Sequence, residues 1–156
     1  MSVLVDTNVL LRAAQTNSPD HALARTTLAT LRRQGHELCV VPQVIYEFWV
    51  AATRPLTANG LGMTTQDAER SIQLLLEDLS LRLDERGIFG RWQSLVTKHE
   101  VKGKNAHDAR LAAAMQRHGL TRVLTFNTAD FSRFAGIDAV SPHDLLSGNL
   151  PTPRSP

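Results

Sequence analysis

The chain has 156 residues, of which 42% are hydrophobic and 21% are charged. That length and composition predict one folded domain with a sizeable core, and they exclude a disordered chain. No apolar run approaches the roughly 20 residues of a membrane span, and we expect neither a membrane association nor a secretory signal. The net charge of +2 is too small to indicate a nucleic-acid binder by itself.

The only cysteine of the chain is Cys39, which lies in the apolar run 38–41. A single thiol forms no internal disulfide framework, so we expect the protein in the cytoplasm. Because the run has the pattern of a buried strand, we interpret the thiol as a core residue and not as a nucleophile.

Apolar runs and helix-like patterns alternate in the first part of the chain. Residues 3–5 are predicted to form a strand, and the helical pattern of 9–13 follows at once. A second helix is predicted over 21–33, where apolar residues recur at helical spacing. The run 38–41 predicts another strand, and the proline that follows it suits the first turn of a helix over 42–53.

The middle of the chain continues the alternation. A glycine-containing loop is predicted at 57–63, followed by a helix over 64–79 that opens with a threonine N-cap signature. A short third strand is predicted at 81–83. Two more helices are predicted over 89–99 and 105–118, and a glycine closes the second of them.

The last elements are two strands with a short helix between them. The strands are predicted at 122–125 and 137–140, and the helix at 129–134. The tail 148–156 contains three prolines and no apolar pattern, so we expect it to be disordered and dispensable for folding. The folded domain is therefore expected over 1–147.

This alternation of strands and helices predicts an α/β fold. The expected architecture is a single-domain α/β/α sandwich, in which a short parallel sheet is covered by helices on both faces. In such open sheets, ligands bind beyond the carboxyl ends of the strands, at the point where the strand order reverses. The first strand usually flanks that point, and Asp6 follows it directly.

Two acidic residues of the first half stand where a packed fold would favour other side chains. Asp6 ends the first strand, although it also suits an ordinary N-cap of the helix that follows. Glu47 falls on the apolar side of its predicted helix, where an unpaired charge is costly. The alternative for Glu47 is a long side chain that reaches back to the surface.

Three polar residues of the second half complete the set of candidates. Asp108 lies in the first turn of its predicted helix, where a negative charge also gains from the helix dipole. Asp130 lies just after the strand 122–125 and also suits a turn. Asn127 adds an amide oxygen at the same strand end.

Each of these signals is weak alone, but together they indicate one chemistry. Carboxylates that are brought together repel one another and need a counterion. Oxygen ligands suit a hard cation such as Mg²⁺ or Mn²⁺. Ions of this kind, held by carboxylates, activate water for phosphodiester hydrolysis. The sequence therefore predicts a divalent metal site at the carboxyl edge of the sheet.

Three segments of the chain resemble the PIN-domain family, and especially its VapC-type toxins of toxin–antitoxin pairs. The segments are VDTNVLL at 5–11, HDARLAA at 107–113 and TFNTADF at 125–131. A helical glutamate in mid-chain adds to them, and the resemblance covers about residues 2–145.

The resemblance implies a PIN-like fold and a metal-dependent endoribonuclease. It places four residues in the acidic positions of the family: Asp6, Glu47, Asp108 and Asp130. Asp6 and Asp108 are the expected ligands of Mg²⁺ or Mn²⁺, with Thr7 and Asn8 as the supporting polar pair. Many relatives carry a carboxylate where this chain has Asn127, so either Asn127 or Asp130 completes the site.

A nuclease also has to bind a phosphate backbone, and several cations lie near the acidic motifs. The candidates for RNA contact are Arg12, Arg54, Lys102, Lys104 and Arg110. A solvated loop is the alternative for the two lysines. His107 adjoins Asp108, but neighbouring residues on a helix point in different directions, so a general-acid role is not favoured. No HExxH or CxxC spacing indicates zinc.

Other functions compatible with these residues are a magnesium-dependent phosphatase and a non-catalytic PIN-like binding module. The aspartyl-phosphate hydrolases need a second aspartate two residues after the first, where this chain has Asn8. For the toxin, the resemblance implies a cognate antitoxin and a homodimer as partners. Trp49, Leu74 and Trp92 are the apolar candidates for such an interface.

Overall fold

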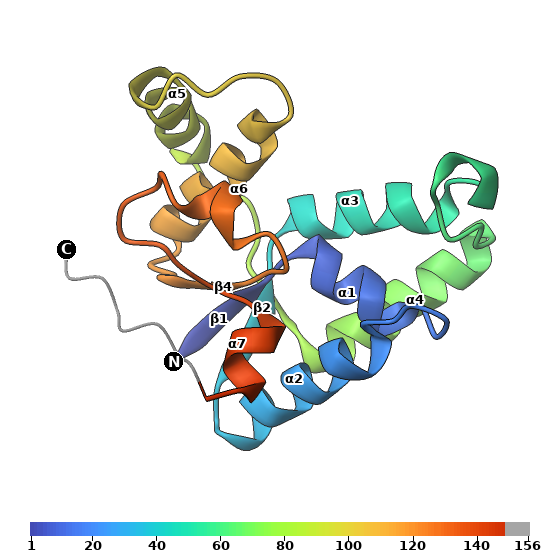
Figure 1. Cartoon of the computed structure of the whole chain (residues 1–156). Helices are drawn as coiled ribbons and strands as arrows, with labels where there is room; N and C mark the ends of the chain where they lie inside the picture. The colour runs from blue at the N-terminus through green and yellow to red at the C-terminus, as the bar shows by residue number, and fades with distance from the viewer. Residues whose placement is uncertain (149–156) are drawn as a thin grey trace.

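A five-stranded parallel sheet forms the centre of the structure, which is a computed structural model describing residues 1–148 (Figure 1). The strand order is β3-β2-β1-β4-β5. The strands are Ser2–Val5 (β1), Glu37–Val40 (β2), Ser80–Leu81 (β3), Arg122–Leu124 (β4) and Asp138–Val140 (β5). All four pairings are parallel. The predicted α/β fold with a short parallel sheet is confirmed, whereas the tail from 149 onward lies outside the described residues.

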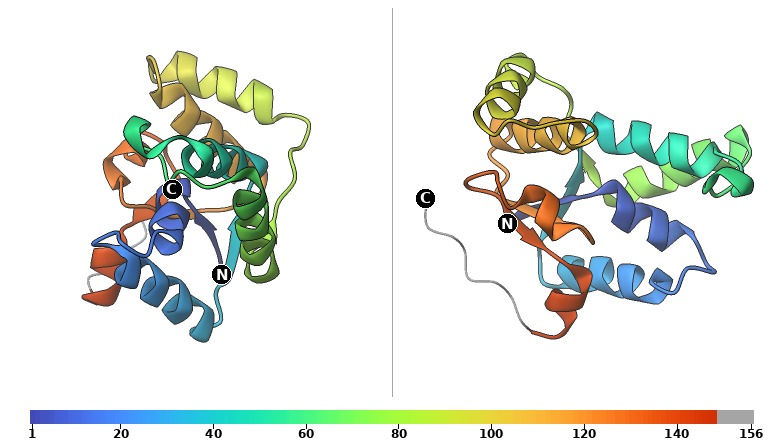
Figure 2. Two further views of the ribbon diagram at one scale, coloured as in Figure 1. Left: turned by 90° about the vertical axis from the view of Figure 1, so that its right-hand side faces the viewer. Right: turned by 45° about the horizontal axis from the view of Figure 1, so that its top comes forward.

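Helices cover both faces of the sheet. The α-helices are Thr7–Ala14 (α1), His21–Arg33 (α2), Pro42–Thr53 (α3), Thr65–Asp78 (α4), Ile88–Lys98 (α5), Asn105–Arg117 (α6) and Pro142–Leu146 (α7). Figures 1 and 2 show α5 and α6 on one side of the sheet and α1, α2 and α7 on the other, while α3 and α4 extend away from it. Every helix in residues 1–148 is too short or too polar to span a bilayer.

The sheet reverses its strand order beside β1. The chain passes from β1 to β2 and β3 on one side, and then returns to add β4 and β5 on the other. The carboxyl ends of β1 and β4 therefore meet at the switch point, where open α/β sheets bind ligands. The backbone N–H of Asp6 donates to the carbonyl of Leu124 at 3.0 Å and extends this pairing by one residue.

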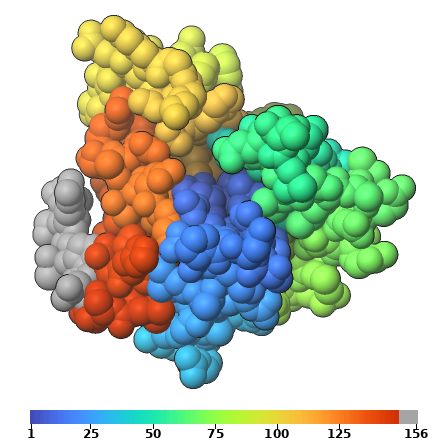
Figure 3. Space-filling model, turned by 45° about the vertical axis from the view of Figure 1, so that its right-hand side comes forward, coloured from blue at the N-terminus to red at the C-terminus, as the bar shows by residue number. Residues whose placement is uncertain are grey.

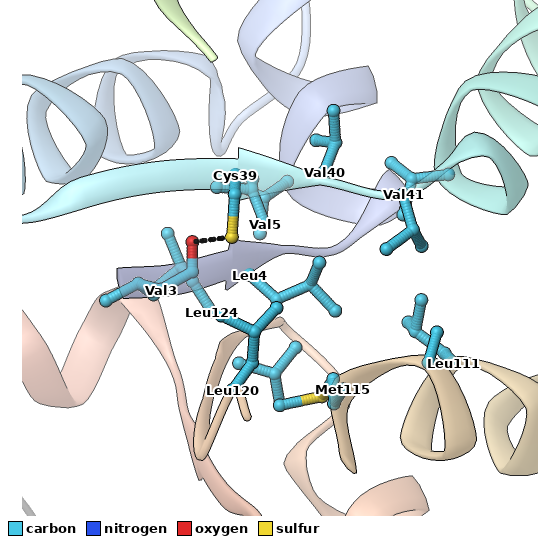
Figure 4. Close-up of a cluster of buried hydrophobic side chains, with 14 of the residues drawn as sticks. Val3, Leu4, Val5, Cys39, Val40, Val41, Leu111, Met115, Leu120 and Leu124 are labelled. Atoms are coloured by element: carbon cyan, nitrogen blue, oxygen red, sulfur yellow. Dashed lines mark hydrogen bonds between the residues drawn. The ribbon is translucent and has the colours of Figure 1, made fainter. Parts of the chain in front are cut away.

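The core fills both faces of the sheet, and one part of it lies between the central strands and α6. Figure 4 shows Val3, Leu4 and Val5 of β1 among residues of β2 and β4, with Leu4 on the side of Leu111 and Met115 of α6. All of the five named side chains are at most 2% exposed. Four alanines of α6 are also fully buried, and their small side chains let this helix pack closely against its neighbours: Ala109, Ala112, Ala113 and Ala114.

Cys39 belongs to this core, as predicted. Its thiol donates to the carbonyl of Val3 at 3.4 Å, as Figure 4 shows. Burial raises the pKa of the Cys39 thiol to about 11. A thiol with such a pKa is not deprotonated at neutral pH, so it is no nucleophile.

Three local features differ from the sequence-based expectation. β3 ends at Leu81 because it pairs with only two residues of β2, and Leu83 is 65% exposed. The helix expected over 129–134 is a short 3₁₀ turn, Thr128–Phe131. The helix α7 was not predicted, although Ser141 followed by a proline is a helix-start signal, and the Ser141 hydroxyl caps it by accepting from the N–H of Asp144 at 3.1 Å.

The loop after α3 folds back on the end of that helix. The N–H of Leu61 donates to the carbonyl of Ala51 at 3.0 Å, and the N–H of Gly62 donates to the carbonyl of Arg54 at 2.9 Å. These bonds satisfy carbonyls that the helix end leaves unpaired. A Cβ atom on Gly60 would lie only 2.0 Å from the carbonyl oxygen of Arg54. Glycine is therefore required at this position.

We expect Gly60→Ala to lower the free energy of unfolding by about 1–3 kcal/mol, because the loop has to move away from Arg54. Gly90 is the matched control: it lies within α5, and a Cβ atom added there would meet nothing within 4 Å. Gly90→Ala should raise the free energy of unfolding by roughly 0.5–1 kcal/mol. Chemical denaturation measures both, and a Gly60→Ala protein as stable as the parent would contradict the prediction.

Candidate active site

A cavity of about 680 Å³ opens at the carboxyl ends of β1 and β4. Figure 3 shows the surface hollowed between α1 in blue, the end of α3 in green and the α6 region in yellow and orange. All seven predicted catalytic and supporting residues line it together: Asp6, Thr7, Asn8, Glu47, Asp108, Asn127 and Asp130. They come from separate elements along the chain, and the fold brings all of them to one place.

Asp6 is both the N-cap of α1 and a wall of the cavity. Its Oδ1 accepts from the backbone N–H of Thr7 at 2.7 Å. Its Oδ2 accepts from the Thr125 hydroxyl at 2.7 Å and from the Asn8 amide at 3.0 Å. The N-cap role and the site role are therefore compatible, because each carboxylate oxygen offers two lone pairs and Oδ1 still has one without a partner among these bonds.

Asn8 and Thr125 fasten the two strand ends to each other. The Asn8 amide also donates to the Thr125 hydroxyl at 3.0 Å, and its Oδ1 accepts from the N–H of Phe126 at 3.1 Å. The Thr125 hydroxyl accepts in addition from the N–H of Asn127 at 3.0 Å. Since Thr125 is fully buried, this network holds Asp6 in one orientation relative to the loop after β4.

Glu47 is held by two donors. The Thr7 hydroxyl donates to its Oε2 at 2.9 Å, and the Gln43 amide donates to its Oε1 at 2.9 Å. Thr7 and Gln43 are 6% and 7% exposed, and Glu47 itself is half-buried. The side chain therefore does not turn back to the surface, which was the alternative that its sequence position left open.

The remaining two carboxylates lie in first turns, Asp108 in α6 and Asp130 in the 3₁₀ turn after β4. Burial, and then the negative charges of Asp130, Asp6 and Glu47, raise the pKa of Asp108 from 3.8 to about 6. Burial also raises the pKa of Asp6, although hydrogen bonds from Thr125 and Thr7 oppose the shift. The four carboxylates therefore repel one another at neutral pH.

The donor set fits a hard cation. It consists of carboxylate and amide oxygens, and the mutual repulsion would be relieved by a divalent ion. Within residues 1–148, no three Asp, Glu, His or Cys side chains are close enough together to form a closed metal site. Mg²⁺, however, is commonly held by one or two carboxylates while it keeps several waters. The arrangement thus suits an open site and not an all-protein cage.

Two of the predicted RNA-contacting arginines are engaged within the protein. The Nε of Arg12 lies 3.3 Å from Oδ2 of Asp20, and its guanidinium stacks over the Phe126 ring at 4.3 Å. Arg110 lines the cavity, but it pairs with Asp84 at 3.0 Å. Arg12 therefore connects α1 to neighbouring segments. Both guanidinium groups have partners within the protein.

The other cations are exposed. Arg54 lies at the end of α3, and both it and His107 line the cavity. Lys102 and Lys104 lie on the loop before α6, outside the cavity wall. Of the five predicted cations, Arg54 has the most direct access to the acidic site.

Two polar residues that hold the acids in place, Thr125 and Gln43, were not among the predicted site residues. Thr125 lay inside a predicted strand and gave no signal beyond a hydroxyl at a strand end. Gln43 stands four residues before Glu47, so a helix places both on one face. That spacing was a usable signal. The apolar part of the cavity wall includes Leu11, Tyr46 and Val50.

The family model described as the PIN domain matches residues 3–137. The chain therefore belongs to the PIN domain family. A comparison with curated protein sequences found no match.

Solved structures show the same fold. VapBC2 from Rickettsia felis, bound to a DNA fragment from its promoter, contains a chain with TM-score 0.70 and 14% identity, covering 90% of this chain and 98% of that one. FitAcB from Neisseria gonorrhoeae contains a chain with TM-score 0.67 and 18% identity, covering 92% of this chain and 99% of that one. VapC20 from Mycobacterium tuberculosis, a Sarcin-Ricin loop cleaving toxin, has TM-score 0.61 and 14% identity, covering 78% of this chain and 86% of that one.

The raised pKa of Asp108 predicts how stability depends on pH. Because this pKa rises from 3.8 to about 6, the folded protein binds the proton more tightly than the unfolded chain does. The charged form therefore costs stability above about pH 6, and the cost vanishes below about pH 4. In EDTA, Asp108→Asn should melt above the parent protein at neutral pH and together with it near pH 4.

Asp67→Asn is the matched control, because Asp67 is the exposed first-turn acid of α4 and pairs with Arg70 at 3.7 Å. It should lose about 0.3–1 kcal/mol of stability at neutral pH, since a favourable helix-dipole charge is removed. Calorimetric melting at both pH values compares the variants. If Asp108→Asn melted like Asp67→Asn at neutral pH, Asp108 would be only a dipole-favoured helix residue.

Proposed function

We propose that this protein is a divalent-metal-dependent endoribonuclease that acts as the toxin of a toxin–antitoxin pair. The observation that carries the proposal is the convergence of four carboxylates in one cavity at the switch point of the sheet: Asp6, Glu47, Asp108 and Asp130. Membership of the PIN domain family and the fold shared with VapBC proteins support it.

In this proposal Asp6 and Asp108 hold Mg²⁺ or Mn²⁺, and Glu47 and Asp130 complete the acidic environment. A bound ion of this kind supplies an activated water and stabilises negative charge at the scissile phosphate. Thr125 and Asn8 keep Asp6 oriented through their bonds to its Oδ2. Asn127 lines the same cavity, but Asp130 is the residue whose charge acts on Asp6 and Asp108, which favours Asp130 as the fourth carboxylate.

RNA is the proposed substrate, and the cytoplasm is the proposed compartment. The similar VapC20 is a Sarcin-Ricin loop cleaving toxin. Arg54 is exposed at the rim of the cavity, and Lys102 and Lys104 are exposed near the start of α6. We assign these three side chains to phosphate contact. Arg12 and Arg110 would reach RNA only by giving up partners within the protein.

Cleavage of a structured RNA tests the proposal. We expect cleavage with Mg²⁺ or Mn²⁺, none in EDTA, and a loss of several orders of magnitude in Asp108→Asn, because an amide replaces a charged ligand. Asp67→Asn should cleave like the parent protein. Hydrolysis of a phosphomonoester without RNA cleavage would favour a phosphatase, and metal binding with no cleavage would favour a non-catalytic module. Either outcome would contradict the proposal.

We also propose that an antitoxin binds the apolar groove between α1, α2 and α4. This second cavity has a volume of about 410 Å³ and is lined by apolar side chains of the three helices, among them Leu10, Leu28, Leu74 and Leu75. Leu74 is 57% exposed, as expected for an interface residue. Several of the similar structures are VapBC or toxin–antitoxin complexes, which supports a protein segment with apolar side chains as the occupant.

For the homodimer, α3 offers a more exposed face than the two tryptophans named from the sequence. Tyr46 and Val50 lie one turn apart and are 63% and 59% exposed. Trp49 and Trp92 are half-buried, and the indole N–H of Trp92 donates to the carbonyl of Ala106 at 2.9 Å. We therefore propose that Tyr46 and Val50, which also line the acidic cavity, take part in the dimer contact, so that the cavity opens beside the interface.

Sedimentation tests both contacts in one experiment. We expect the chain alone to be a dimer at micromolar concentration and to form a heavier complex with the protein encoded next to its gene. Leu74→Asp should weaken that complex at least about tenfold, or about 1.4 kcal/mol, and leave the dimer intact. Leu83→Asp is the control, because Leu83 is similarly exposed but lies outside the groove. A strict monomer that the added protein does not change would contradict both contacts.

A further inference from the structure

Gln43 is a buried amide beside the acidic cavity, and the proposed function leaves it without a role. It lies at the start of α3, it is 7% exposed, and it contacts two other segments. Its amide nitrogen donates to Oε1 of Glu47 at 2.9 Å and to the carbonyl of His107 at 2.9 Å. Its carbonyl oxygen accepts from the guanidinium of Arg110 at 3.2 Å.

These three bonds fix the orientation of the amide. A glutamine amide has two N–H donors and one oxygen, and both donors of Gln43 face acceptors while its oxygen faces a cation. A rotation by 180° would bring the oxygen against Glu47 and the backbone carbonyl, and the NH₂ group against Arg110. All of these contacts would then be repulsive. The amide therefore has one stable orientation.

Arg110 is itself held by an ion pair, so the contacts of Gln43 continue to a further residue. Its second terminal nitrogen pairs with Asp84 at 3.0 Å, in the segment between β3 and α5. The pairing reduces the freedom of the guanidinium, so the side chain remains available to the Gln43 oxygen. The series Asp84–Arg110–Gln43–Glu47 thus runs from the protein surface to the acidic cavity.

Gln43 also joins the two helices that carry two of the carboxylates. Glu47 lies one turn further along α3, and the carbonyl of His107 lies in the first turn of α6, next to Asp108. A bond to each fixes the separation of Glu47 from Asp108. The other oxygen of Glu47 is bound by Thr7 at 2.9 Å, so the whole carboxylate is held.

From this geometry we infer that Gln43 is a positioning residue, which orients Glu47 and sets its spacing from Asp108 for metal binding and RNA cleavage. The inference rests on the proposed function. Gln43 does not itself contact the substrate or the ion in this role. It acts through Glu47, with Arg110 fixing the direction of its amide.

The test compares Gln43→Met with the parent protein. Methionine keeps the length of the side chain but removes all three hydrogen bonds. We expect the affinity for Mn²⁺, measured by calorimetry, and kcat for RNA cleavage each to fall by about 10–100-fold, with KM unchanged. A merely structural role would lower the melting temperature in EDTA and leave the Mn²⁺ affinity intact. Unchanged Mn²⁺ affinity would overturn the inference.

Gln73→Met is the matched control. Gln73 also donates its amide to a glutamate one turn away, Glu69 at 3.2 Å, but on the exposed face of α4. It should behave like the parent protein. Arg110→Met is the second variant, since Arg110 is half-buried and its loss frees the Gln43 amide without removing it. Its Mn²⁺ affinity should fall less than that of Gln43→Met, and an unchanged value would overturn the orienting role of Arg110. If Gln43→Met did not fold, Arg110→Met would decide the inference.

Asp108→Asn separates failure of this inference from failure of the proposed function. If the parent protein binds Mn²⁺ and cleaves RNA, Asp108→Asn does neither, and Gln43→Met equals the parent, only the role of Gln43 is overturned. If the parent protein neither binds Mn²⁺ nor cleaves RNA, the proposed function and the role of Gln43 are both overturned.

Discussion

The repulsion among carboxylates in one partly buried cavity is the constraint on which the site depends. Burial and the neighbouring acids raise the pKa of Asp108 to about 6, and burial raises the pKa of Asp6 as well. Groups whose charged form is disfavoured in this way are concentrated at functional sites. The protein keeps them together with specific donors: Thr125 and Asn8 bind Asp6, and Thr7 binds Glu47.

The fold supplies the stability that this cluster removes. The central strands are buried on both faces, and buried side chains of α6 pack against the sheet. The same packing places the first turn of α6, with Asp108, beside the ends of β1 and β4. The packing of α6 on the sheet therefore contributes to both the stability and the geometry of the site.

Much of the fold follows from periodicity in the sequence. The strand–helix alternation predicts the parallel sheet, and a proline and a glycine mark the start of α3 and the end of α6. The short edge strand β3 and the helix α7 were harder to predict, because few contacts define the first and only five residues form the second. The local sequence pattern predicts the ends of a strand or helix poorly where pairing with distant residues determines those ends.

The acidic residues of the site could be predicted, but their supporting contacts could not. Asp6 and Asp108 stand in motifs with a recognisable order of residues. Thr125 and Gln43 act across 119 and 64 residues of sequence, on Asp6 and on the His107 carbonyl. Arg12 likewise has its two partners in other segments: it pairs with Asp20 and stacks over the Phe126 ring. Contacts of this kind depend on the register of the sheet and the docking of helices, which the residues alone do not specify.

The central claim is that Asp6 and Asp108 together hold a divalent ion in this cavity. Anomalous diffraction at the manganese edge, from crystals grown with Mn²⁺, tests it most directly, because the signal locates the ion independently of any activity. We expect a manganese peak bonded to carboxylate oxygens of both residues. A cavity without a peak, or a manganese ion bound only elsewhere on the protein, would contradict it.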